Sequence, residues 1–169
     1  FADYAIQFVD EQKDDRPFFL YLAFNAPHWP LHAKEKDIQK FTKIYRKKGW
    51  DEIREARRKR MAKMGIIDSN TDFAEWENRK WDELTEKDQV AYRMAVYAAQ
   101  VHCVDYNIGK LIDCLKKNHK MDNTLILFMS DNGACAEPYE ELGGGKVEEV
   151  NNPASSFAPT YGRAGAQGS

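Results

Sequence analysis

Several features that would define a function class are missing from this sequence. No apolar run approaches the roughly 20 residues that a membrane-spanning helix needs, and no signal-peptide pattern opens the chain. The three cysteines include no C-x-x-C pair, so neither a disulfide framework nor a zinc ribbon is indicated. The phosphate-binding P-loop, the G-x-S-x-G elbow of serine hydrolases and the HExxH motif of zinc proteases are also absent. We therefore expect no membrane partner, and the sequence leaves localisation and oligomeric state open.

An excess of positive charge is missing too. With 25 Lys and Arg against 27 Asp and Glu, the formal charge is −2, so no overall positive field attracts nucleic acid. One basic run, residues 54–63, could be a nucleic-acid footprint, but its charges surround a single short helix. We interpret it as a solvated helix face and expect no nucleic-acid partner. The hydrophobic content of 43% is typical of a globular protein.

The apolar pattern alternates between helix-like and strand-like segments. Apolar residues at steps of three and four predict helices over residues 3–12, 34–48, 51–64 and about 85–120, with Gly49 and Gly65 as stops. For the longest of these helices a coiled coil is an alternative to packing on a sheet. Two continuous apolar runs, 18–24 and 124–129, are typical of strands buried on both faces. We expect residues 68–84 to form a loop or broken helix held by aromatic side chains.

This order of elements predicts an α/β fold in which helices cover a mostly parallel sheet. We expect residues 1–139 to form the domain and residues 140–169 to continue it as a loop-rich or disordered segment. Ligands of parallel sheets collect beyond the carboxyl ends of the strands. His28 follows the first predicted strand by four residues, and Asp131 and Asn132 follow the second by two and three. The topology therefore brings these three side chains towards one edge.

Asp131 and Asn132 offer one carboxylate and one amide carbonyl, which are hard oxygen ligands suited to Ca²⁺ or Mg²⁺. Followed by Gly133, they could equally form a tight turn in which Asx side chains bond their own backbone. His28 could donate a proton or hydrogen bond to a leaving-group oxygen, although a loop histidine can also be structural. The other histidines are weaker candidates: His32, His102 and His119.

Several segments resemble the sulfatases, and especially the bacterial arylsulfatases. Residues 17–31, PFFLYLAFNAPHWPL, are similar to the family's strand and histidine segment. Residues 94–101, MAVYAAQV, and 122–134, DNTLILFMSDNGA, resemble its long helix and its metal-binding corner, in the same order. Shorter likenesses occur at 49–51 and 63–65, and the similarity becomes patchy after about residue 137.

The resemblance implies an alkaline-phosphatase-like fold and hydrolysis of sulfate esters by a formylglycine nucleophile. That residue is made from Cys or Ser in a C/S-x-P-x-R motif, and a Ca²⁺, or Mg²⁺, screens the anionic oxygens. By the resemblance, Asp131 and Asn132 are two metal ligands and His28 lies near the leaving-group oxygen of a small sulfate ester.

No cysteine of this chain lies in C-x-P-x-R, so we expect the nucleophile, its arginine and the remaining metal ligands upstream of Phe1. We read the chain as an internal part of a catalytic domain that is inactive alone. Residues 161–164 resemble the approach to the family's substrate lysine. Two other functions remain open: a phosphodiesterase or phosphomutase of the same superfamily, which would need a fuller two-metal site, and a non-catalytic binding homologue.

Overall fold

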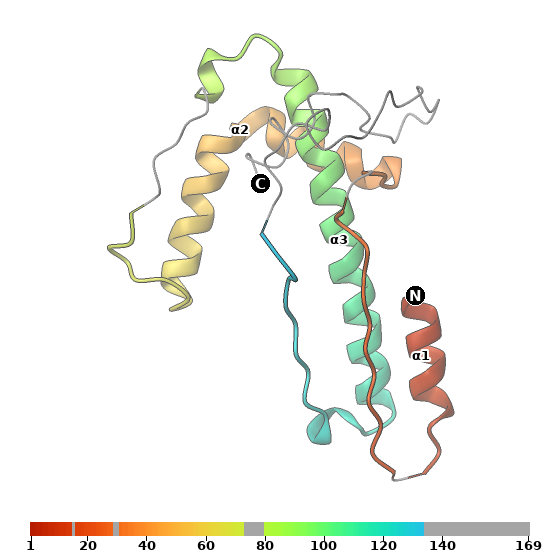
Figure 1. The fold of residues 1–169 in the computed structure, drawn as a ribbon. Coiled ribbons are helices and arrows are strands. Elements are labelled where there is room, and N and C mark those ends of the chain that lie inside the picture. Colours follow the sequence, from red (N-terminus) through yellow and green to blue (C-terminus); the bar gives the residue numbers. More distant parts are fainter. Residues whose placement is uncertain (15, 29–30, 73–79, 134–169) are drawn as a thin grey trace. The chain divides into compact units, whose positions relative to one another are not determined.

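The computed structural model describes residues 1–14, 16–28, 31–72 and 80–133. In chain order the elements are α1 (Ala2–Glu11), α2 (Glu35–Lys63), η1 (Trp81–Glu83), α3 (Lys87–Lys117) and η2 (Met121–Asn123), where η marks a 3-10 helix (Figure 1). They fall into two compact units, one built from Phe1–Trp29 with Gln100–Gly133 and the other around Pro30–Ala99. No helix among the described residues has the length and apolar character of a membrane span.

In the first unit, α1 lies against the C-terminal part of α3 (Figure 1). Apolar residues from both helices and from the segments that follow them form its core: Val9, Cys114 and Leu115, with Ile6, Phe8, Phe18, Leu20, Leu111 and Met121 packed around them. The rings of Phe8 and Phe18 meet edge to face at 5.9 Å, a favourable geometry for aromatic pairs. The predicted first helix and the end of the long helix are thus confirmed.

The two apolar segments predicted as buried strands differ from that prediction. Both are extended, but neither forms a strand with any described residue, so the predicted parallel sheet is not confirmed. In segment 18–24 the side chains alternate. Phe18 and Leu20 face the helices, whereas Phe19 and Tyr21 are 88% and 82% exposed. In segment 124–129, Leu125 is 85% exposed. Burial on both faces requires neighbouring strands, which the described residues do not supply.

The second unit contains the two helices predicted over 34–48 and 51–64, which form as α2 with a break at Gly49. Gly49 has φ 65° and ψ 176°, a conformation open to glycine but not to residues with a Cβ. The break lets Trp50 turn inward, where its ring meets Trp81 edge to face at 5.6 Å. The Trp81 backbone N–H donates to Asp51 Oδ2 over 2.7 Å. This confirms the expected aromatic anchoring for Trp81, while residues 73–79 lie outside the described part.

The first half of α3 closes this core. Its buried residues pack on the tryptophan pair, and the complete cluster is Trp50, Trp81, Leu84, Val90, Ala91 and Met94, with Tyr45 against it. The predicted long helix is therefore confirmed, although Val101 on its apolar stripe is 43% exposed. Cys114 is buried, whereas Cys103 is exposed. Cys135 and the predicted loop-rich segment 140–169 lie outside the described residues.

Candidate active site

The two extended segments both begin near the C-terminal end of α3, the first after α1 and the second after α3. Lys120, just ahead of the second segment, donates from Nζ to the carbonyl oxygen of Asp14, just ahead of the first, over 3.5 Å. From there both segments run in the direction opposite to α3 (Figure 1). Parallel directions from a common start are what the sequence predicts for two strands of a parallel sheet. Within this unit, His28 and Asp131 accordingly follow the far ends of segments that point the same way.

His28 closes a tight turn at the end of its segment. Its backbone N–H donates to the Asn25 carbonyl over 2.9 Å, and the Ala26–Pro27 peptide within the turn is cis. Proline fixes φ and removes a donor, so the segment cannot continue as a strand through this point. His28 itself is exposed. The turn therefore presents the imidazole at the surface of the unit.

Asp131 and Asn132 lie in a bend, and their side chains bond neighbouring backbone groups, as the turn interpretation of the motif predicts in part. Asp131 Oδ1 accepts from the Asn132 backbone N–H over 3.0 Å, and Asn132 Nδ2 donates to the Gly133 carbonyl over 2.7 Å. The Ser130 hydroxyl donates to the Asn132 carbonyl over 2.6 Å. These contacts between adjacent residues hold the side chains without using all their oxygens.

The turn and the metal interpretation are compatible. Asp131 Oδ2 makes no hydrogen bond with any described residue, and the Asn132 amide donates through nitrogen, which leaves its carbonyl oxygen for another partner. Two such oxygens with one negative charge fit a hard cation, but Ca²⁺ takes six to eight ligands. The described residues contain no group of three or more His, Cys, Asp or Glu side chains that could hold a metal ion. The corner therefore fits only part of a coordination shell.

One polar network was missed at the level of sequence. Asp10 on α1 accepts from Asn118 Nδ2 over 2.7 Å and from the Cys114 thiol over 3.4 Å. The hydrogen bonds hold the pKa of Asp10 below its usual value, and burial raises the pKa of Cys114. A thiol kept protonated is a poor nucleophile, so this cysteine is structural. Only the i, i+4 spacing of Cys114 and Asn118 could have suggested the network.

The weaker histidine candidates differ from His28 in their surroundings. His32 and His102 are half-buried, and His119 is exposed with φ 55° at the end of α3, where its N–H donates to the Lys116 carbonyl over 3.0 Å. His119 thus belongs to the helix terminus.

Comparison with known proteins gives a consistent result. The family model described as Sulfatase matches residues 1–165. The chain is similar to an uncharacterised sulfatase of Schizosaccharomyces pombe, at 41% identity over 84% of this chain and 26% of that protein. It is 38% identical to an arylsulfatase of Klebsiella aerogenes over 71% of this chain and 26% of the relative. Human N-acetylgalactosamine-6-sulfatase is 25% identical over 83% of this chain and 17% of its own length. The chain thus spans about a quarter of its nearer relatives.

Proposed function

The chain belongs to the sulfatase family, and we propose that the protein it forms part of hydrolyses sulfate esters with a formylglycine nucleophile and a divalent cation. The family implies an alkaline-phosphatase-like fold. The observation that carries the proposal is the pair of turns in the first unit. Each follows an extended apolar segment, both segments point the same way, and the turns hold His28 and Asp131–Asn132.

In the proposed site, Asp131 and Asn132 contribute two oxygen ligands to Ca²⁺, or to Mg²⁺ in its place. The cation would supply a positive charge that screens the sulfate oxygens as negative charge develops on them. Asp131 Oδ2 and Asn132 Oδ1 suit this role because neither oxygen is used in the hydrogen bonds of the bend. The other ligands and the nucleophile would come from chain beyond the described residues.

We propose that His28 serves the leaving group. When the ester S–O bond breaks, the alkoxide or phenoxide oxygen takes up charge, and an imidazolium N–H can donate to it. An exposed imidazole on a proline-fixed turn is held in place without being buried away from substrate. Esters with basic leaving groups need this help most, since a nitrophenoxide leaves readily without a proton.

The exposed apolar segments support the view that the described residues are part of a larger domain. Phe19, Tyr21 and Leu125 are more than four-fifths exposed, although each side chain would gain about 1.5–3 kcal/mol on full burial. Neighbouring strands on these segments would bury that surface and fix the distance between the two turns. The 169-residue chain on its own should therefore show no turnover of an aryl sulfate.

The test uses the complete protein encoded by the parent gene, assayed with 4-nitrophenyl sulfate and phenyl sulfate. Asp131→Ala should lower kcat/KM about 100-fold or more and raise the Ca²⁺ concentration needed for half-maximal activity. Asp122→Ala, an exposed aspartate ahead of the second segment, is the matched control. Unchanged Ca²⁺ dependence in Asp131→Ala would contradict the metal role.

His28→Asn should reduce activity about 100-fold or more on phenyl sulfate but much less on 4-nitrophenyl sulfate. His119→Asn, at the other end of the unit, should change neither rate. Equal losses on both esters would argue against a leaving-group role. Faster hydrolysis of bis(4-nitrophenyl) phosphate than of any sulfate ester would favour the phosphodiesterase alternative instead.

A further inference from the structure

The second half of α2 and the loop after it line an open cavity of about 210 Å³. The helix ends in a glycine cap: Gly65 has φ 72° and donates to the Ala62 carbonyl, while the Ile66 N–H reaches back to Met61 over 3.0 Å. This hydrogen-bond pair is a Schellman motif, which reverses the chain onto its own helix. Residues from both sides line the space: Arg54, Arg57, Arg58 and Met61 from α2, and Ile67, Thr71 and Asp72 from the loop.

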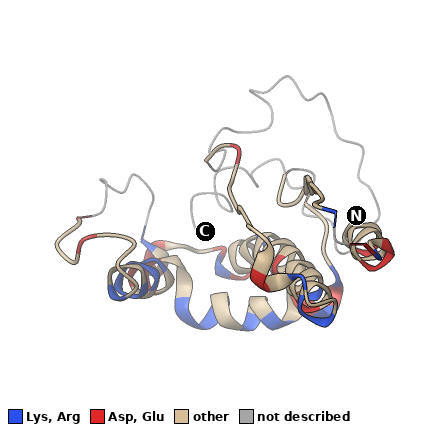
Figure 2. Cartoon of the chain, turned by 90° about the horizontal axis from the view of Figure 1, so that it is seen from below, with Lys and Arg blue, Asp and Glu red and all other residues tan. Residues whose placement is uncertain are grey.

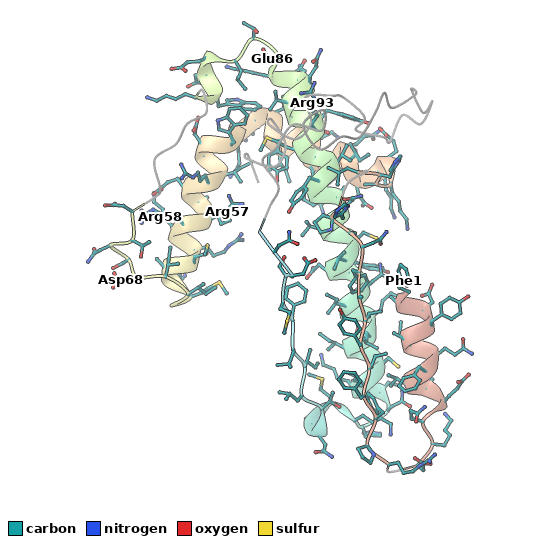
Figure 3. The ribbon with its side chains drawn as sticks, viewed as in Figure 1. Phe1, Arg57, Arg58, Asp68, Glu86 and Arg93 are labelled. Carbon is teal, nitrogen blue, oxygen red and sulfur yellow. The ribbon has the colours of Figure 1, made fainter. Side chains whose placement is uncertain are left out.

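The loop is fixed by its own hydrogen bonds. Asp68 Oδ1 accepts from the Asn70 N–H over 2.8 Å, and its carbonyl accepts from the Thr71 N–H over 3.0 Å. Arg58 Nη1 donates to the Ser69 carbonyl over 3.3 Å and so ties the loop to the helix. Figure 3 shows Arg57 and Arg58 on α2 and Asp68 on the loop that follows. The cavity is thus built from structured backbone on both sides.

Positive charge prevails among the described residues of the lining. Its three guanidinium groups face one lining carboxylate, Asp72, and a second carboxylate, Glu55, is held by Arg58 at 3.0 and 3.1 Å. Arg57 differs from its neighbour, because its guanidinium forms neither a hydrogen bond nor an ion pair with any described residue. It is nevertheless only half-exposed. A partly desolvated guanidinium attracts an oxyanion more strongly than one in open water.

The basic run at residues 54–63 is only partly the solvated helix face that the sequence predicts. Lys and Arg recur along α2 (Figure 2), and Lys59, Arg60 and Lys63 are exposed as a solvated face requires. Arg54 and Arg57, in contrast, are half-buried in the cavity wall. Helical spacing produces the division, since positions 54, 57 and 58 share one face of the helix.

We propose that this cavity binds a small organic anion, a single sulfonate, sulfate or carboxylate group carried on an aryl body, with Arg57 as its main anion contact. The apolar side chains of Met61 and Ile67 provide a surface for the body of such a ligand. The volume is below the roughly 300–1,000 Å³ of pockets for drug-sized ligands, so the ligand is smaller than those. The proposal does not depend on the proposed sulfatase activity.

The experiment titrates the 169-residue chain with benzenesulfonate, benzoate, inorganic sulfate and benzyl alcohol, and follows the arginine Nε–Hε signals by NMR. Benzenesulfonate or benzoate should shift the Arg57 signal in a saturable way, and the stronger of the two identifies the preferred head group. Inorganic sulfate lacks the aryl body and benzyl alcohol lacks the charge, so both should bind at least several-fold more weakly. Equal affinity for inorganic sulfate would overturn the proposal, as would the absence of saturable binding by either aryl anion.

Matched variants separate a site from general attraction. Arg57→Gln should weaken binding about tenfold or more, the loss expected for hydrogen bonds to a charged group. Arg60→Gln removes the same charge from the exposed face of the same helix and should change affinity less than about twofold. Thr71→Glu adds a carboxylate from the loop side and should weaken binding without altering the helix. Equal losses in Arg57→Gln and Arg60→Gln, with helicity unchanged by circular dichroism, would refute the site.

Discussion

Replacing Gly49 by alanine should destabilise the second unit strongly, because two separate costs coincide at that residue. The first is conformational: φ 65° with ψ 176° lies in a region essentially restricted to glycine, and holding another residue there costs about 1–3 kcal/mol. The second is steric, since an added Cβ would overlap the ring of Trp81. The Trp81 ring packs on Trp50, and the Trp81 backbone N–H donates to Asp51. The ring therefore cannot move away freely.

Overpacking of a core of this kind costs about 1–3 kcal/mol, so the two costs together predict a loss of about 2–6 kcal/mol. Gly65→Ala is the matched control. Gly65 has φ 72° but nothing lies within 4 Å of an added Cβ, so only a backbone cost of about 1–2 kcal/mol applies. Because small domains are stable by about 5–15 kcal/mol, the difference between the two variants is measurable.

Urea unfolding followed by circular dichroism at 222 nm and by tryptophan fluorescence measures both losses. A double-mutant cycle isolates the steric part: in a Trp81→Ala background, Gly49→Ala should cost only the conformational part, about 1–3 kcal/mol. The reasoning would be refuted if Gly49→Ala were no more destabilising than Gly65→Ala in the otherwise unchanged chain. It would also fail if the cost of Gly49→Ala were the same with and without the Trp81 ring.

Two further predictions concern the contact between α1 and α3. The hydrogen bonds from Asn118 and Cys114 lower the folded pKa of Asp10 below the ordinary 3.8, so their stabilisation is present at neutral pH and is lost as pH falls through and below that value. Asn118→Ala should raise the Asp10 pKa, measured by carboxyl NMR titration, and should flatten the loss of stability in acid; an unchanged titration would contradict this. In the Cys135→Ser variant, iodoacetamide at mildly alkaline pH should alkylate exposed Cys103 well before Cys114, whose pKa burial raises. Equal rates at the two thiols, measured by peptide mass spectrometry, would show that α1 does not cover Cys114.

Helical features were predictable because their causes are local. The stops at Gly49 and Gly65 need only a residue that tolerates positive φ, and both glycines have that conformation. The stripe that contains Val90 and Met94 predicted the buried face of α3 from spacing alone. The pairing of Trp50 with Trp81 was not predictable, since it joins positions 31 residues apart across a kink whose angle no local pattern sets.

For the candidate site, the sequence predicts which residues are involved but not how far apart they lie. Pro27 and Gly133 mark where each segment must stop, which is why the turns at His28 and Asp131 could be anticipated. Local bonds from Asp and Asn side chains to the backbone are expected from the residue types, and the bend at Asp131 has such bonds. The distance between the two sites has no such local cause, because no residue pattern within either segment determines it.

The exposed residues of segment 18–24 explain why sequence and structure differ there. A strand with one solvated face carries polar residues at every second position, yet the outward positions here hold Phe19 and Tyr21. Apolar residues at both inward and outward positions are typical of a strand that is covered on both faces. Among the described residues, only the face that carries Phe18 and Leu20 is covered. The proposed cation ligands, Asp131 and Asn132, lie at the end of the other extended segment, where Leu125 likewise has no covering neighbour among the described residues. We therefore expect the 169-residue chain to bind Ca²⁺ weakly or not at all, and micromolar binding by calorimetry would show that the corner at Asp131 is complete without a paired sheet.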